Sequence, residues 1–189
     1  MTTLSEDRQH LDFDDDWIVV KWDERAEFTS GLRGSLQRRG DGVKGADVVG
    51  VGGRGSAKVA LVAEFKDFDN PRIPAAQAAD AARKATSTSL IDDLVRKVID
   101  TLCGATFAHD ASRRRGAELT PWRPAVATTT TQLLLLFCIE VPRTQAAAVG
   151  PWTKRLQQRL RWLGPNARVL VTSSTTPFTA AGVRYRVDT

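Results

Sequence analysis

The chain has 189 residues, a length that favours one domain with a sizeable hydrophobic core. Apolar residues make up 42% and charged residues 26%, which is typical of a globular chain and excludes a wholly disordered one. The net charge of +5 is compatible with a polyanionic partner, and Cys103 and Cys138 lack the CxxC spacing of a zinc site, so both are expected to be reduced core residues.

The amino-terminal segment is polar. Residues 1–16, which end in DFDDD, are expected to form a polar arm rather than a signal peptide, and residues 17–189 a single domain. The run LLLLFCI at 133–139 is too short to span a bilayer, which takes about 20 residues in a helix. A buried strand and a cytoplasmic protein without membrane contact are therefore expected.

The first half of the chain predicts a β-hairpin. WIVVKW at 17–22 is expected to be a strand or the start of a helix, and residues 23–42 are rich in glycine and arginine, which favours turns. KGADVVGV at 44–51 and AKVALVAEFKDF at 57–68 predict two strands. GGRGS at 52–56 suits the hairpin turn between them, because glycine reaches positive φ at little cost.

The second half predicts helices that alternate with strands. The expected elements are a helical region at 75–107 with a break near 87–89, a basic loop at 110–124, a strand at 128–141, a helix at 150–164, a strand at 167–174 and an edge strand at 182–187. Helices between strands favour right-handed crossovers. The predicted fold is therefore α/β, with a mixed central sheet, a β-hairpin followed by helix, strand, helix and strand, and helices on both faces.

The second hairpin strand carries an acid and a lysine on one face. Side chains alternate along a strand, so Glu64 and Lys66 emerge on the same side. If the hairpin places Asp47 opposite Val62, Asp47 shares the face of Glu64 one diagonal step away, about 7–8 Å. A slip of one residue would send Asp47 to the other face.

Two carboxylates that converge repel each other unless a cation lies between them. All-oxygen ligands suit Mg²⁺ or Mn²⁺. The ammonium of Lys66 beside such an ion could hold a phosphate oxygen or help to generate and orient a hydroxide. A metal ion lowers the pKa of an attacking water and screens developing charge, so Asp47, Glu64 and Lys66 together suit hydrolysis of a phosphodiester.

The segment GADVVGV…VALVAEFKDF resembles the motif of the PD-(D/E)XK phosphodiesterase superfamily, the restriction-endonuclease-like fold. The match is an Asp near the start of one hairpin strand and an acid-x-Lys on the next, followed by helix, strand, helix and strand, over residues 43–174. The resemblance implies that Asp47 and Glu64 bind magnesium and that Lys66 is the catalytic lysine.

Other features of the family are matched less fully. The resemblance implies an acid from an upstream helix, for which Glu27 or Glu24 is the candidate. Gln77 is the candidate for a glutamine that some members carry on the following helix. The family's proline before the Asp is absent, since Gly45 and Ala46 stand there.

Residues such as Arg113, Arg114 and Arg115 most often form a solvated loop. In a nuclease, several basic residues are candidates for phosphate contact: Arg38, Arg39, Arg113, Arg114, Arg115 and Lys154. Trp122 could stack on a base or serve as a packing anchor. His10 and His109 have no partner at ligand spacing and are given no catalytic role.

The trio also has a simpler interpretation. Glu64 and Lys66 could be a solvated pair on an exposed strand, and Asp47 a strand residue paired with Lys44 or Arg54. The apolar residues before Glu64 on both faces of the strand favour a site instead.

We therefore expect a Mg²⁺-dependent endonuclease that hydrolyses phosphodiester bonds of nucleic acid, with DNA favoured over RNA. The resemblance implies a restriction, antiviral defence or repair context, and a homodimer or a subunit of a larger assembly. The alternative is a non-catalytic subunit that keeps the fold and binds nucleic acid or a protein. The complete set of Asp47, Glu64 and Lys66 favours the enzyme.

Overall fold

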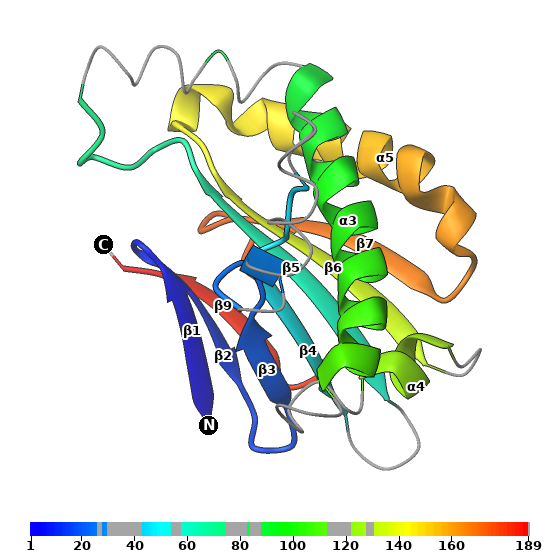
Figure 1. The fold of residues 1–189 in the computed structure, drawn as a ribbon. Coiled ribbons are helices and arrows are strands. Elements are labelled where there is room, and N and C mark those ends of the chain that lie inside the picture. The colour runs from blue at the N-terminus through cyan, green and yellow to red at the C-terminus, as the bar shows by residue number, and fades with distance from the viewer. Residues whose placement is uncertain are drawn as a thin grey trace.

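A mixed sheet of five strands forms the centre of the protein and contains the predicted hairpin (Figure 1). Its strands, in spatial order, are β3 (Ile18–Lys21), β4 (Val48–Gly52), β5 (Val59–Asp67), β6 (Gln132–Glu140) and β7 (Ala167–Thr172). β3, β4 and β5 pair antiparallel, and β5, β6 and β7 pair parallel. The structure is a computed structural model that describes residues 1–25, 28–29, 43–53, 58–74, 83, 88–112, 122–127 and 131–188.

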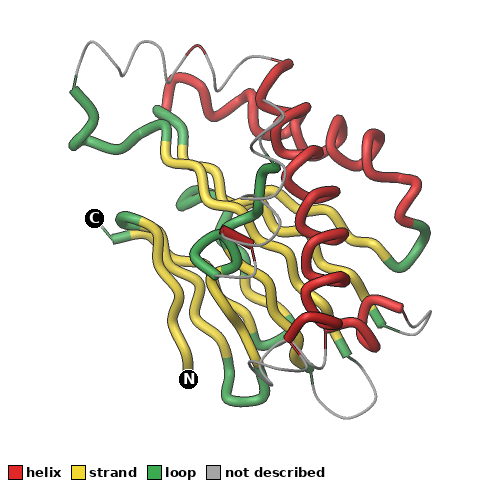
Figure 2. Tube along the Cα trace, viewed as in Figure 1, coloured by secondary structure: helices red, strands yellow, loops and turns green. Residues whose placement is uncertain are grey.

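Three helices cover one face of this sheet (Figure 2). They are α3 (Thr88–Ser112), α4 (Trp122–Ala127) and α5 (Val149–Leu160), with short 3₁₀ helices η4 (Arg143–Ala148) and η5 (Arg161–Leu163) at the ends of α5. Leu94, Trp122 and Trp152 pack with Val62 and Phe137 in one core. The predicted mixed sheet and the order hairpin, helix, strand, helix, strand are confirmed. In the part of the chain that is described, no helix is long and apolar enough to cross a membrane.

A second sheet covers the opposite face of the central sheet. Its antiparallel strands lie in the order β1 (Thr2–Glu6), β2 (Gln9–Phe13), β9 (Val183–Val187) and β8 (Thr179–Ala180). Leu11, Phe13 and Tyr185 pack there against Leu61 and Leu136. The described helices do not bear out the prediction of helices on both faces of the central sheet. Helices α3, α4 and α5 all lie on one face, and the second sheet covers the other. The predicted edge strand at 182–187 is a strand, but of this second sheet.

The prediction of a polar arm at residues 1–16 is wrong. Residues 2–13 form the β1–β2 hairpin, with Asp7 at positive φ (49°) in its turn. Leu11 and Phe13 are fully buried. The segment looks polar because only one side of an antiparallel sheet faces the core, so few of its residues need to be apolar.

A polar network joins the two sheets near the carboxyl ends of β5 and β6. Gln9 Nε2 donates to the carbonyl of Lys66 at 3.2 Å and to the hydroxyl of Tyr185 at 3.0 Å. That hydroxyl in turn donates to Oε1 of Glu140 at 2.8 Å. Because buried polar groups are costly without partners, this network fixes how the second sheet meets the end of β5.

The packing between the sheets can be tested at Gly52 of β4. A Cβ on Gly52 would overlap the indole ring of Trp17, whose Nε1 donates to the Ala181 carbonyl at 2.9 Å. We expect Gly52→Ala to lower the free energy of unfolding in urea by about 1–3 kcal/mol, as overpacking a closed core does. Gly150→Ala in α5 is the control, because a Cβ there meets nothing within 4 Å. Equal stability of the two variants would contradict this packing.

Candidate functional site

Asp47 and Glu64 lie directly opposite one another at the end of the β4–β5 ladder. Val48 pairs with Ala63 and Val49 with Val62, so the next position toward the carboxyl end of β5 sets Asp47 against Glu64. Asp47 Oδ2 accepts a hydrogen bond from the backbone N–H of Phe65 at 2.6 Å. The predicted opposition of Asp47 to Val62 is thus wrong by two residues. A shift of two keeps the face of the strand, so the predicted convergence of the two carboxylates holds.

Glu64 is the most buried member of this site, with 1% of its side chain exposed. Its Oε1 contacts the ammonium groups of both Lys66 and Lys97, the latter at 2.5 Å. Its Oε2 has no hydrogen-bond partner among the described residues. The interpretation of Glu64 and Lys66 as a solvated pair on an exposed strand is therefore wrong for Glu64.

Lys97 of α3 is a member of the site that sequence reasoning missed. Its Nζ lies between the two carboxylates, 2.5 Å from Oε1 of Glu64 and 3.6 Å from Oδ1 of Asp47. A signal was present in the helix, because Leu90, Leu94 and position 97 are spaced by four and three residues and so lie on its buried face. A lysine on such a face needs a charged partner.

Helix α3 also fixes the chain that leads into Asp47. The backbone N–H of Ala46 donates to Oγ1 of Thr101 at 2.7 Å, and that of Lys44 donates to Oδ2 of Asp100 at 2.9 Å. Thr101 is fully buried. The helix that supplies Lys97 therefore also holds the start of β4, and the two sides of the site cannot shift independently.

Asp23 is a third acid close to this cluster. It follows Trp22, whose backbone N–H donates to the carbonyl of Asp47 at 2.8 Å. Burial, and then the negative charge of Asp47, raise the pKa of Asp23 to about 6. Of the upstream acids that were expected, Glu24 is instead paired with Lys21 at 2.9 Å and exposed, and Glu27 lies outside the described residues.

The negative charges of Asp47 and Glu64 are balanced by the ammonium groups of two lysines, Lys66 and Lys97. Burial, and then the charge of Asp47, raise the pKa of Glu64, while Lys66 and Lys97 act in the opposite direction. Burial by itself would lower the pKa of Lys97, but the charges of Glu64 and Asp47 outweigh it and the pKa is raised. Two carboxylates thus face two ammonium groups in a site that is largely closed to water.

The donor set suits a small divalent cation held by few protein ligands. Among the residues that the structure describes, no group of three or more His, Cys, Asp or Glu side chains is placed to hold a metal ion. Mg²⁺ is commonly bound by one or two carboxylates, with waters and substrate phosphate in the other positions. Asp47 and Glu64 meet that need, and the buried Oε2 of Glu64 has no hydrogen-bond partner to lose among the described residues. The residues therefore fit Mg²⁺ or Mn²⁺.

The other predicted residues do not join the cluster. Trp122 is buried in the helix-side core, so it is a packing residue, and Lys154 is exposed on α5. His10 bonds to Ser5 and Asp188. Cys138 is buried as expected, whereas Cys103 is exposed, which corrects its prediction as a core residue. Arg38, Arg39, Gln77 and Arg113 to Arg115 lie outside the described residues.

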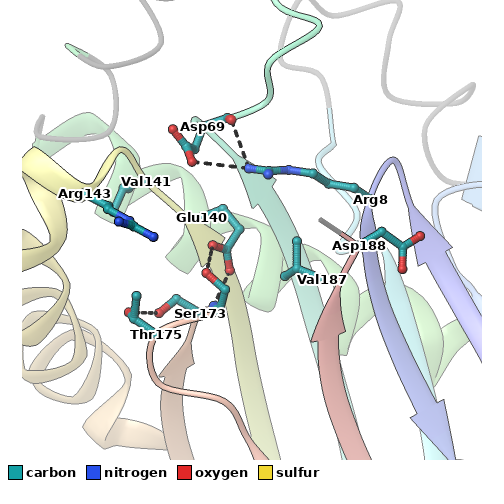
Figure 3. A pocket seen from close by; sticks show the side chains of 10 residues that line it. Arg8, Asp69, Glu140, Val141, Arg143, Ser173, Thr175, Val187 and Asp188 are labelled. Carbon is teal, nitrogen blue, oxygen red and sulfur yellow. Dashed lines mark hydrogen bonds and ion pairs between the residues drawn. The ribbon is translucent and has the colours of Figure 1, made fainter.

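A pocket of about 380 Å³ opens at the carboxyl ends of the parallel strands (Figure 3). Glu140 forms its floor and is held by the N–H and hydroxyl of Ser174, each at 2.6 Å. Arg8, on its rim, is paired with Asp67 at 2.7 Å and with Asp69 at 3.5 Å. Most charges of the pocket are thus already satisfied within it.

Arg143 is the exception in this pocket. Within the described part of the chain it has no ion-pair partner, and it is exposed. Glu140 points to the second sheet, where it accepts a hydrogen bond from Tyr185, whereas Glu64 points to the helix layer and contacts Lys97. The pocket and the carboxylate cluster therefore lie on opposite faces of the central sheet, and Arg143 is a candidate for phosphate contact that is separate from the cluster.

No family model, curated protein or solved structure matches the chain.

The raised pKa of Asp23 predicts a pH dependence of stability. Its folded-state pKa of about 6 lies above the ordinary 3.8, so between these values the folded protein binds more protons than the unfolded chain. The contribution of Asp23 is therefore greatest near pH 4 and declines as the pH rises through 6. We expect Asp23→Asn to gain stability relative to the wild type between about pH 4 and 7, by a modest amount because a half-buried carboxyl is partly screened.

Urea denaturation at several pH values measures this difference. Asp16→Asn, which changes an exposed aspartate, serves as the control. A stability difference between wild type and Asp23→Asn that stays constant over this range would contradict the electrostatic coupling of Asp23 to Asp47.

Proposed function

We propose that the protein is a metal-dependent nuclease that hydrolyses phosphodiester bonds of nucleic acid, with DNA as the first substrate to test. The observation that carries the proposal is that Asp47 and Glu64 lie opposite each other on paired strands, with the ammonium of Lys66 in contact with Oε1 of Glu64. A buried carboxylate with one bare oxygen costs stability, which is more readily explained by a site than by structure alone.

The fold gives this proposal limited further support. The β4–β5 hairpin, followed by helix, strand, helix and strand, is the element order that the resemblance to PD-(D/E)XK nucleases implies. Asp47 directly precedes β4, and Glu64 and Lys66 lie on β5. The second sheet is an addition to that expectation, and fold by itself does not imply function.

Hydrolysis would join a water oxygen to phosphorus and break the bond from phosphorus to one sugar oxygen. The water gives up one proton and the leaving oxygen takes one up. A divalent ion supplies Lewis-acid stabilisation of the phosphate and a lower pKa of water when it is bound. Asp47 and Glu64 would hold that ion, because their carboxylates converge on the same ammonium group, that of Lys97.

Lys66 is placed to act on the nucleophile or on the phosphate. Its ammonium contacts Oε1 of Glu64 and donates to its neighbour's carbonyl, that of Phe65, at 3.0 Å. About a third of its side chain, 32%, is exposed, so it can reach a substrate at the mouth of the site. A positive charge fixed there stabilises the negative charge that develops on the phosphate oxygens in the transition state.

A non-catalytic subunit is the second candidate, and Lys97 is the observation that favours it. Together with Lys66, its ammonium already neutralises both carboxylates without a metal ion. A nucleic-acid-binding or protein-binding relic would be stable in that state. Cleavage experiments therefore decide between the two candidates.

Substitution of Glu64 and Lys66 tests the nuclease proposal. We expect purified protein to cleave plasmid or single-stranded DNA with Mg²⁺ or Mn²⁺ and to lose this activity in EDTA. Glu64→Gln and Lys66→Met should each lower the cleavage rate by about 100-fold or more, as loss of one stabilising group of an active site does.

Arg96→Met is the matched control for these variants. Arg96 lies on α3 with Asp100 as its partner, at 3.7 Å, and Asp100 can keep its hydrogen bond from the Lys44 N–H without it, so the variant removes a charge outside the cluster. Circular dichroism would show that every variant is folded. Cleavage that survives in Glu64→Gln, or a lack of cleavage with every nucleic acid tested, would reject the enzyme and leave the binding subunit.

Arg143 provides a separate test of nucleic-acid binding. We expect Arg143→Ala to weaken binding of a labelled DNA in EDTA regardless of its sequence, and to reduce the salt dependence by about one phosphate contact. Fluorescence anisotropy between about 50 and 200 mM salt measures both effects. Arg168→Ala, which changes an exposed arginine near the other end of β7, is the control. Equal losses in the two variants would indicate nonspecific charge attraction rather than contact at Arg143.

A further inference from the structure

Lys97 occupies the position that a cation between Asp47 and Glu64 would take. Its Nζ contacts Oε1 of Glu64 at 2.5 Å and lies 3.6 Å from Oδ1 of Asp47. A magnesium ion would bind oxygens at about 2.0–2.1 Å, in the same gap between the strands. The ammonium group and the metal ion therefore compete for the place between the two carboxylates, with Oε2 of Glu64 the one oxygen that Lys97 does not contact.

Lys97 is not the lysine that the acid-x-Lys pattern supplies. Lys66 already contributes one ammonium to Oε1 of Glu64 from the strand, and Lys97 contributes another from the helix layer. Only 19% of the Lys97 side chain is exposed, so water does little to screen its charge. Two carboxylates and two ammonium groups sum to zero, and Asp23 nearby adds one negative charge above its pKa of about 6. A divalent ion added with both ammonium groups in place would therefore leave a net positive charge.

The backbone that carries Lys97 is held in place. Thr101, one turn further along α3, accepts a hydrogen bond from the N–H of Ala46 at 2.7 Å. Helix and strand are thus tied together, so Lys97 can leave the carboxylates only by a movement of its side chain. Its flexible four-carbon stem lets the ammonium move without a shift of the helix.

We propose that Lys97 is a built-in cation of this site, which holds Asp47 and Glu64 together in the free protein and must be displaced when a divalent ion binds. The inference rests on the proposed function, since it concerns the same site. It makes Lys97 a positioning residue that sets the metal affinity. Displaced from the carboxylates, its ammonium becomes available to a phosphate of the nucleic acid, so bound nucleic acid favours the displaced state.

Binding of Mn²⁺ to the full chain, measured by isothermal titration calorimetry without nucleic acid, tests this. We expect Lys97→Met and Lys97→Gln to bind Mn²⁺ at least about ten-fold more tightly than the wild type, because the competing charge is gone. Lys97→Arg, which keeps the charge, should not show this gain. Arg96→Met, on the adjacent position of α3, should bind as the wild type does.

Thermal unfolding in EDTA gives a second readout that does not depend on activity. Without a metal ion, both neutral variants leave Asp47 and Glu64 to repel each other, so each should melt below Arg96→Met. Mn²⁺ should raise their melting temperatures more than that of the wild type. Because Gln and Met differ in polarity but not in charge, agreement between them excludes an effect of packing alone.

The outcomes separate the two ideas. Mn²⁺ affinities within two-fold in wild type and both neutral variants would overturn the role of Lys97 while leaving a metal site for the nuclease. Weaker binding in the neutral variants would also overturn it, since Lys97 would then help to assemble the site. Absence of Mn²⁺ binding in every variant would reject both the inference and the metal chemistry of the proposed function.

Discussion

The burial of Glu64 beside Asp47 is the constraint on which the rest of the site depends. Carboxylates on neighbouring strands, away from water, lose their hydration and repel each other. Lys66 and Lys97 offset this cost because both ammonium groups contact the same oxygen of Glu64. If one charge is removed, the others are left uncompensated. The site therefore depends on the position of α3 relative to β4 and β5.

The helix layer and the second sheet both help to hold these elements in place. On the helix side, Thr101 and Asp100 hold the backbone that leads into Asp47. On the other side, Gln9 of the second sheet holds the carbonyl of Lys66. Side chains that must keep a fixed geometry need such supporting contacts. The second sheet is thus more than a cover for apolar strands, because it secures the end of β5 at which the acid and the lysine stand.

The part of the site that could be predicted is the part that one hairpin contains. Alternation along β5 placed Glu64 and Lys66 together, and the glycine-rich turn placed Asp47 on the partner strand. The register was two residues from the observed one, which did not matter because the face repeats every two residues. Lys97 and Asp23 could not be found in this way, since each reaches the cluster from another element.

The sequence by itself determined the strands and helices with a strong period and the shared face of the acid and the lysine, because these follow from local backbone geometry. That residues 2–13 are strands follows from long-range pairing, since β2 pairs with β9, with Gln9 opposite Val187. The contact of Lys97 with Glu64 and Asp47 likewise arises only when α3 packs on the sheet. Contacts of this kind join segments far apart in the chain, and their energy depends on burial and distance that no local pattern encodes.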